Sequence, residues 1–145
     1  MRILELCDPA IAKVKASASA ADAIREMLEH HVGAVAVLDD HEHLAGIFTE
    51  RDVMKRLALS GRDPAQVPVR ELMTTTVEIA SGDMPAREAL SIMVERHVRH
   101  LPIVDVEGHV LGVLSIRNLL QAQVEELSHE LDSVEQYMSN DGPGG

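Results

Sequence analysis

Three side chains that could hold a phosphorylated ligand lie close together between Gly46 and Asp52: the hydroxyl of Thr49, the guanidinium of Arg51 and the carboxylate of Asp52. The pattern predicts a buried strand that runs into a helix, and such a junction offers free backbone N–H groups and the positive end of a helix dipole to an anion. Thr49 has a second expected role, because Thr-x-x-Asp spacing is that of a capping box with Asp in place of Glu or Gln. Capping does not exclude ligand binding, since the same hydroxyl can also meet a phosphate.

The same segment returns 66 residues later, from Gly112 to Asn118, with Ser115 and Arg117 at the matching positions. Shifting the chain by this offset aligns its two halves without a gap, and the matches fall on core and turn positions together. The offset is too long for a solenoid unit and suits a duplicated half-domain. Because Arg51 recurs as Arg117, the alternative that both are ordinary exposed helix residues is weakened.

A dense cluster of cationic side chains runs from Arg96 to His100 in this otherwise acidic chain. Arg99 and His100 are expected at a turn between a helix and a strand, where two cationic groups could converge on an anion. For Arg96 the alternative is an ion pair with a nearby carboxylate.

Metal and catalytic sites are not expected. His41 and His43 lie in a predicted turn, without a carboxylate or cysteine that completes a ligand set. Cys7, the single cysteine, excludes an internal disulfide and is interpreted as a small core residue. No nucleophile is followed by a credible base, so we expect no enzyme. The histidines that are metal candidates by count alone are His30, His31, His41, His43 and His109.

The composition bounds the class of protein. The 145 residues are 46% hydrophobic and only 1% aromatic, which suits one domain with an aliphatic core. A net charge of −11 argues against binding to nucleic acid or to an anionic membrane, because both need a basic surface. The sequence shows no basic-then-apolar leader and no apolar run long enough to span a bilayer. We therefore expect a soluble cytoplasmic protein without nucleic-acid or membrane partners.

Each half of the chain predicts the same order of elements: a strand, a helix, two strands and a second helix. We expect a first repeat at residues 1–60, a linker at 61–68, a second repeat at 69–127, a helix extension at 128–138 and a disordered tail at 139–145. The expected elements of the first half are a strand near Ile11–Val14, a helix starting at Ser17 or Ser19, strands Ala34–Leu38 and Leu44–Phe48, and a helix Glu50–Leu59. Those of the second are a strand near Val77–Ala80, a helix starting at Asp83 and Pro85, strands Leu101–Val104 and Val110–Leu114, and a helix from Ile116.

The last helix carries apolar residues at alternating steps of four and three, which is a heptad-like seam. Fewer than three clean heptads argue against a stable isolated coiled coil. The seam therefore packs either on the body of its own module or within a homodimer whose main contact lies elsewhere, and we favour the homodimer. The seam residues are Leu120, Val124, Leu127, Leu131, Val134 and Met138.

From about Ile3 to Leu127 the two halves resemble a tandem pair of CBS domains, also called a Bateman module. The resemblance rests on the Gly-h-x-[Ser/Thr]-x-x-Asp junction, present twice, and on the segment His-Leu-Pro-Ile-Val-Asp from His100 to Asp105. It implies an α/β (α+β) fold in which two β-α-β-β-α repeats pack by pseudo-twofold symmetry, here with an extended C-terminal helix. It also implies two clefts that bind an adenosyl ligand (AMP, ADP, ATP or S-adenosylmethionine), no required cofactor, and a homodimer.

In the first cleft the resemblance implies that Ile47 lines the adenine, Asp52 holds the ribose hydroxyls, and Thr49 and Arg51 face the phosphates. The other repeat is implied to contribute Thr76, Val98 and the backbone near Arg99. The second cleft is implied to use Val32 and Gly33 with Val113, Ser115, Arg117 and Asn118, while Arg99 and His100 reach phosphates near the centre.

Two departures from the family pattern predict unequal clefts. Asn118 replaces the ribose carboxylate, which costs on the order of 1–2 kcal/mol of binding through a weakened hydrogen bond. The first repeat has Gly33 and Ala34 where the second has Arg99 and His100. We expect the cleft that contains Asp52 to bind more tightly.

Two functions are carried forward. The first is a regulatory module that senses an adenine nucleotide, most naturally AMP or ATP, and signals occupancy to an unidentified protein partner through its conformation or its dimer. The alternative is a dimerisation scaffold whose clefts are vestigial or filled by S-adenosylmethionine or NAD.

Overall fold

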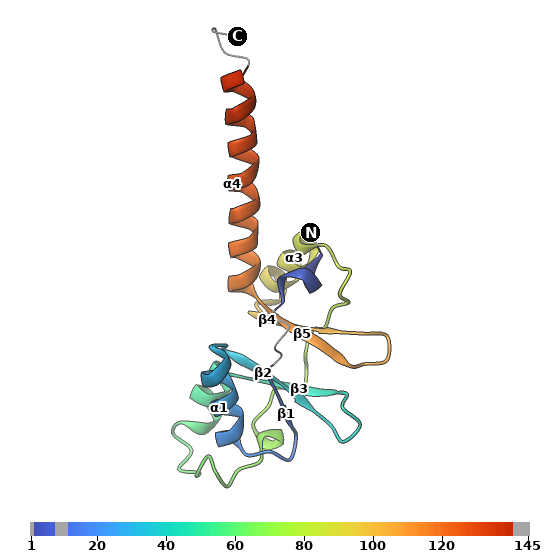
Figure 1. Cartoon of the computed structure of the whole chain (residues 1–145). Helices are drawn as coiled ribbons and strands as arrows, with labels where there is room; N and C mark the ends of the chain where they lie inside the picture. Colours follow the sequence, from blue (N-terminus) through green and yellow to red (C-terminus); the bar gives the residue numbers. More distant parts are fainter. Residues whose placement is uncertain (1, 8–11, 141–145) are drawn as a thin grey trace.

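The duplication is visible in the strand pairing of the computed structural model, which describes residues 2–7 and 12–140. Strands β2 (Ala34–Leu38) and β3 (Leu44–Thr49) form an antiparallel hairpin, and so do β4 (His100–Val104) and β5 (Val110–Ser115) (Figure 1). The registers are equivalent residue by residue, and both hairpins have a bulge at the same place, after Val37 and after Ile103. The predicted pair of α/β repeats is confirmed.

The first strand of the pattern survives fully in only one repeat. β1 (Lys13–Lys15) pairs in parallel with β2, and the Ala36 N–H donates to the Ala12 carbonyl at 3.0 Å. In the second repeat the strand expected near residues 77–80 is reduced to a single bridge between Ala80 and Ile103. Pro102 occupies the position of Ala36 and has no N–H to donate, so the matching bond cannot form.

Two equivalent helices cover the hairpins. Helix α1 (Ala20–His30) begins at Ser19, whose hydroxyl accepts from the Asp22 N–H at 3.1 Å, as is usual for an N-cap. Helix α3 (Ala86–Arg96) begins after Pro85 without a side-chain cap. Both end at a left-handed histidine, with φ of 54° at His31 and 57° at His97. The buried faces are equivalent too: Ala20, Ala23 and Met27 in α1, and Ala86, Ala89 and Met93 in α3.

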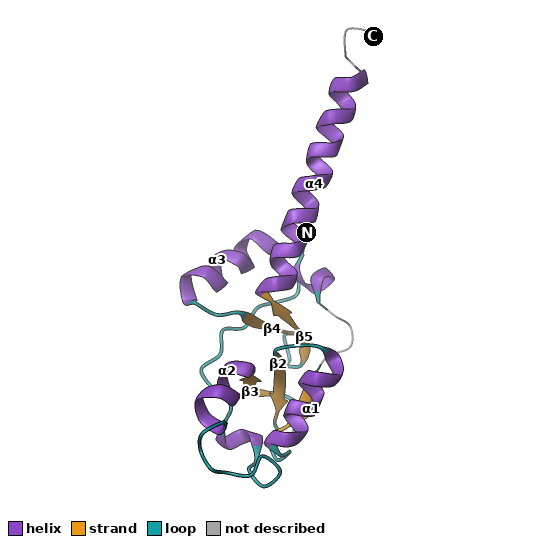
Figure 2. Ribbon diagram, turned by 90° about the vertical axis from the view of Figure 1, so that its left-hand side faces the viewer, coloured by secondary structure: helices purple, strands orange, loops and turns teal. Residues whose placement is uncertain are grey.

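The second helices of the repeats differ in length. In repeat one, α2 (Glu50–Asp52) continues as a π-helical turn (Val53–Leu57), so this helix ends near the predicted limit. In repeat two, α4 (Ile116–Asn140) runs on for 25 residues and stands away from the body in both views (Figures 1 and 2). The helix includes residues 139 and 140, which were expected to belong to the disordered tail. The rest of that predicted tail, residues 141–145, lies outside the described residues.

The apolar seam of α4 does not pack on its own body. Its described side chains, Leu120, Val124, Leu127, Leu131 and Val134, are between 46% and 64% exposed. This excludes the first of the two interpretations given above for the seam. No helix among the described residues is both long enough and apolar enough to cross a membrane, and the expected cytoplasmic location stays a prediction.

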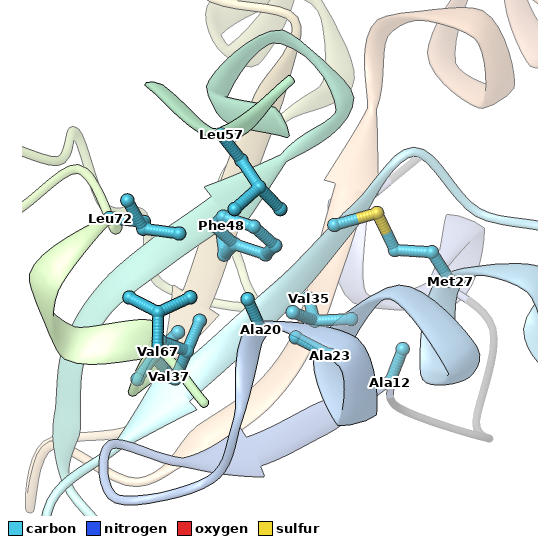
Figure 3. Close-up of a cluster of buried hydrophobic side chains, with 11 residues drawn as sticks. Ala12, Ala20, Ala23, Met27, Val35, Val37, Phe48, Leu57, Val67 and Leu72 are labelled. Atoms are coloured by element: carbon cyan, nitrogen blue, oxygen red, sulfur yellow. The ribbon is translucent and has the colours of Figure 1, made fainter. Parts of the chain in front are cut away.

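Each repeat has its own core, and each core is completed by a segment from the other half. The core of repeat one surrounds Phe48, which is fully buried among side chains of β2, α1 and the linker (Figure 3). Val69, in the 3-10 turn Val69–Glu71 at the start of repeat two, packs into this core. Ile3, in the 3-10 turn Ile3–Leu6, packs instead into the core of repeat two.

Backbone hydrogen bonds fix this crossing. The Ile3 N–H donates to the Met84 carbonyl at 3.0 Å, and the Val69 N–H donates to the Ala18 carbonyl at 2.8 Å. The 3-10 turns are equivalent in sequence, since they lie 66 residues apart. The two repeats are thus joined by exchanged lead segments as well as by the linker.

Candidate functional site

The strand-to-helix junction of repeat one is closed by the predicted capping box, which is confirmed. The Thr49 hydroxyl oxygen accepts from the Asp52 N–H at 3.2 Å, and Asp52 Oδ2 accepts from the Thr49 N–H at 3.0 Å. The Thr49 hydroxyl also donates to Oδ2 at 3.2 Å. Asp52 therefore has a structural role, whatever else it binds.

The other carboxylate oxygen of Asp52 is engaged by the first residues of repeat two. Thr74 donates its hydroxyl to Asp52 Oδ1 at 3.0 Å, and Arg56 Nε lies 3.9 Å from the same oxygen. Thr74 is held there by a two-way backbone bridge with Ile47 at 2.8 and 2.9 Å. Asp52 is only 5% exposed. A ligand hydroxyl that approaches Oδ1 would meet an oxygen that already accepts from Thr74.

The matching junction of repeat two lacks this arrangement. Ser115 caps α4, because its hydroxyl oxygen accepts from the Asn118 N–H at 3.0 Å. Asn118 is exposed, and within the described residues its amide makes no hydrogen bond. Among the described residues, the second junction thus has a capped helix but no buried carboxylate.

The repeats meet at Gly33, Glu50 and His100. The Glu50 N–H donates to the Gly33 carbonyl at 3.0 Å, and the Ile116 N–H donates to the Arg99 carbonyl at 2.8 Å in the equivalent place. A Cβ at Gly33 would lie 3.2 Å from Glu50 Cδ and 3.5 Å from His100 Nε2. Burial lowers the pKa of His100, with Arg99 acting in the same direction and Glu50 opposing it. His100 is therefore mainly a neutral donor at neutral pH.

The predicted cationic groups fall into two classes. Arg51, Arg99 and Arg117 are exposed and, within residues 2–7 and 12–140, form neither an ion pair nor a side-chain hydrogen bond, so their guanidinium groups are free to meet an anion. Arg96 instead lies 3.8 Å from Glu78, as its alternative interpretation expected.

The remaining predicted residues are spread around the two junctions. Ile47 is buried in β3 beside Thr74, and Val113 is half-buried in β5. Val32 and Val98 follow the left-handed ends of α1 and α3 and are half-buried. Thr76 is exposed, and no contact of the described residues joins it to the others.

Sequence reasoning missed Thr74 and Glu50. Thr74 begins a run of three threonines, so composition alone could not select it. Glu50 lies beside Thr49 in the junction, but only the packing of the repeats places its carboxylate near His100.

His109 was a metal candidate by count alone, and the structure adds neighbours that the sequence analysis did not consider. The turn that contains His109 does supply carboxylates, since Asp105, Glu107 and His109 each offer a ligand atom within 4.8 Å of the others. The sequence gives both carboxylates at close spacing, but only the turn geometry turns them toward the imidazole.

Two surface hollows of about 400 and 430 Å³ lie beside β1. Both are lined by Val14 and Lys15, and neither contains a candidate ligand residue. The candidate site is therefore defined by its side chains at the junctions.

A protein-family model described as "CBS domain" matches this chain twice, at residues 3–59 and 69–125. An uncharacterized 17.7 kDa protein of Acidianus ambivalens is 36% identical over 86% of this chain and 74% of its own length. Other relatives are longer: the chain spans 58% of CBS domain-containing protein CBSX3 of Arabidopsis thaliana (31% identical over 81% of this chain) and 31% of arabinose 5-phosphate isomerase KdsD of Pseudomonas aeruginosa (36% identical over 70%).

Solved structures with CBS domains have the same fold. A putative signal-transduction protein of Burkholderia ambifaria superposes with a TM-score of 0.73 at 32% identity, covering 81% of this chain and 85% of that one. The CBS pair of protein MJ0100, in complex with 5-methylthioadenosine and S-adenosyl-L-methionine, has a TM-score of 0.77 at 21% identity (87% and 98% covered). CBSX2 in complex with AMP has a TM-score of 0.75 at 24% identity (86% and 97% covered).

Proposed function

The chain belongs to the CBS domain family, with two copies of the domain, and we propose that it is a regulatory module that binds an adenine nucleotide between its repeats. CBS pairs are ligand-sensing regulatory modules. The observation that carries the proposal for this chain is that Glu50, inside the capped Thr49–Asp52 junction, lies near His100 of the other repeat. The function needs no cofactor and no catalytic residue.

The side chains at the first cleft match the parts of an adenine nucleotide. Free guanidinium groups at Arg51 and Arg99 suit phosphate oxygens, because charge-assisted hydrogen bonds to phosphate are strong. Ile47 offers an apolar surface for the base, and Asp52 an acceptor for ribose hydroxyls. The complexes of CBSX2 with AMP and of MJ0100 with adenosyl compounds support this ligand class through the shared fold.

The route from occupancy to signal runs through Thr74. A ribose hydroxyl that takes Asp52 Oδ1 displaces the Thr74 hydroxyl, which now holds that oxygen at 3.0 Å. Thr74 is bridged to β3 and follows the 3-10 turn that completes the core of repeat one. Ligand binding would therefore loosen the contact between the start of repeat two and the core of repeat one. A partner protein that binds both repeats would sense occupancy through the resulting change in their relative position.

A homodimer is supported by an apolar face that obeys the internal symmetry. Leu28 on α1 and Val94 on α3 are equivalent and are 69% and 60% exposed. Met54 and Leu120 on the second helices are equivalent too, and are 68% and 46% exposed. Duplicated exposed apolar positions on four helices suit a shared interface better than scattered surface residues do.

The test of the nucleotide is thermal unfolding of the full chain with AMP, ADP, ATP, S-adenosylmethionine and NAD. A ligand at 100 times its Kd should stabilise the protein by about 2.7 kcal/mol. Arg99→Ala should weaken binding about tenfold or more through a lost charged hydrogen bond, while Arg25→Ala, an exposed arginine paired with Asp22 on α1, should leave it unchanged. A flat response to all five compounds would favour the scaffold, which the engagement of Asp52 and the exposed Asn118 also support.

The dimer is tested separately by light scattering. The double variant Met54→Glu with Leu120→Glu should be a monomer, because it places charges in the proposed apolar face. Leu59→Glu is the matched control, since Leu59 is 99% exposed but its equivalent in repeat two is Glu125. Equal effects of both changes would count against this interface.

A further inference from the structure

The turn between β4 and β5 gathers three potential metal ligands. His109 Nδ1 lies 3.5 Å from Asp105 Oδ2 and 3.5 Å from Glu107 Oε2. Neighbouring ligand atoms around a tetrahedral Zn²⁺ are about 3.4 Å apart when the bonds are about 2.1 Å long. The two distances from His109 match this spacing, and all three ligand atoms lie within 4.8 Å of one another.

The backbone of the turn presents these ligands. Asp105 Oδ1 accepts from the Glu107 and His109 N–H groups, both at 2.9 Å, which turns Oδ2 toward the imidazole. Such outer hydrogen bonds orient ligands in metal sites.

A second imidazole comes from the other repeat. His43 and His109 form an antiparallel bridge, and their ring centroids are 5.2 Å apart. The turn that contains His43 is the 66-residue equivalent of the first, and its Asp39 accepts from the N–H groups of His41 and His43 in the same way. The two turns therefore face each other across the internal symmetry with a histidine at each centre.

We propose that Asp105, Glu107 and His109 bind a divalent transition-metal ion of the Zn²⁺ type, and that the neighbouring His43 side chain turns toward the ion to become its fourth ligand. Two imidazoles and two carboxylates suit Zn²⁺ or Co²⁺, whereas Mg²⁺ and Ca²⁺ prefer oxygen alone. The side chains of Asp105, His109 and Glu107 are 33%, 43% and 73% exposed, so an ion can enter from solvent. A bound ion would tie the two hairpin turns, and hence the two repeats, to each other.

The competing explanation is that a protonated His109 forms ion pairs with the two carboxylates. The distances of 3.5 Å suit that pairing equally well. The two explanations differ in whether the turn binds a metal ion. A protonated imidazole repels a cation, whereas a neutral imidazole can be its ligand.

Titration of the full chain with Co²⁺ at neutral pH separates them, since tetrahedral Co²⁺ absorbs visible light far more strongly than octahedral Co²⁺. We expect a strong visible band that saturates at one ion per chain and is bleached by Zn²⁺. Glu107→Gln should weaken Co²⁺ binding by about tenfold or more. This variant keeps the fold, because the turn is held by Asp105 and by backbone N–H groups.

His43→Gln should change the band, because it removes the ligand supplied by the other repeat. The matched control is His129→Gln, which removes an exposed histidine of α4 away from both turns. No tetrahedral band, or equal binding by Glu107→Gln and the unaltered protein, would overturn the proposal. A band lost equally with His129→Gln would overturn it too, by showing that surface histidines bind the ion without a defined site.

Discussion

Thr49 and Ser115 cap equivalent helices, yet the residue three positions later behaves differently in the two repeats. In repeat one, Asp52 is buried and its two oxygens bind Thr49 and Thr74. In repeat two, Asn118 is exposed, and α4 continues to Asn140 instead of ending after two turns. The hydroxyl at each junction caps the helix that begins there. The carboxylate of Asp52 additionally accepts a hydrogen bond from Thr74 of repeat two. Among the described residues, the first junction is thus both a cap and an inter-repeat contact, whereas the second is a cap alone. The position equivalent to Thr74, residue 8, lies outside the described residues.

The largest expected effect breaks this contact. Asp52→Ala should lower the free energy of unfolding by about 2–4 kcal/mol, because it removes a cap and leaves the Thr49 N–H and the Thr74 hydroxyl without their acceptor. Asn118→Ala should cost less than about 0.5 kcal/mol, as for most exposed positions. Urea unfolding of both variants measures the difference. Equal losses would show that the two junctions are energetically alike.

A smaller effect isolates the inter-repeat hydrogen bond from the cap. Thr74→Val keeps the shape of the side chain and removes its donor to Asp52, so unfolding should become easier by about 1–2 kcal/mol. Thr75→Val is the matched control, because Thr75 is exposed and next in sequence. Urea unfolding of the pair gives the contribution of the bond, and a Thr74 loss no larger than that of Thr75 would exclude it.

The comparison is sharpened by giving repeat two the missing carboxylate. Asn118→Asp completes the capping spacing with Ser115 and should stabilise the protein by about 0.5 kcal/mol. If the proposed nucleotide site is correct, it should also tighten the second cleft about tenfold, since a charged acceptor replaces an amide. Calorimetric titration with the compound that stabilises the chain in the thermal-unfolding test measures the affinity of the second cleft. Gln121→Glu is the control for added charge on the same helix. Unchanged affinity at the weaker cleft would contradict the expected role of this position.

The smallest effect concerns the pH dependence of stability and His100, whose equivalent in repeat one is Ala34. Burial holds the pKa of His100 in the folded chain below its ordinary value of 6.5. As the pH falls through that value, the unfolded chain takes up a proton that the folded chain resists, so stability at pH 7.5 should exceed that at pH 5.5. His100→Gln should reduce this difference, and His129→Gln should not. Unfolding curves at the two pH values test it, and an identical difference in His100→Gln would refute it.

Local signals in the sequence predicted what depends on neighbouring residues. The capping box at Thr49, the cap at Ser19 and the equivalent strands follow from spacing within a few residues, and all are present. The first strand of repeat two was predicted at greater extent than the single bridge observed, because the effect of Pro102, which lacks the donor that Ala36 supplies in repeat one, was not considered.

Long-range contacts were not predictable from the same signals. The hydrogen bond from Thr74 to Asp52 spans 22 residues and depends on the backbone bridge between Thr74 and Ile47 of β3. The meeting of His43 with His109 depends on the packing of two turns that are 66 residues apart. In both cases the sequence shows the residue types, but which two residues come into contact depends on how the repeats pack together.

The exchanged lead segments make a single repeat an unfinished folding unit. A chain cut between the repeats would leave the first fragment without Val69 and the second without Ile3, so each piece would lack a buried residue of its own core. The two fragments should therefore regain structure by complementation when they are mixed. One repeat produced alone should exchange its N-terminal 3-10 turn with that of a second copy, which is domain swapping. The covalent linker turns that concentration-dependent exchange into an intramolecular one.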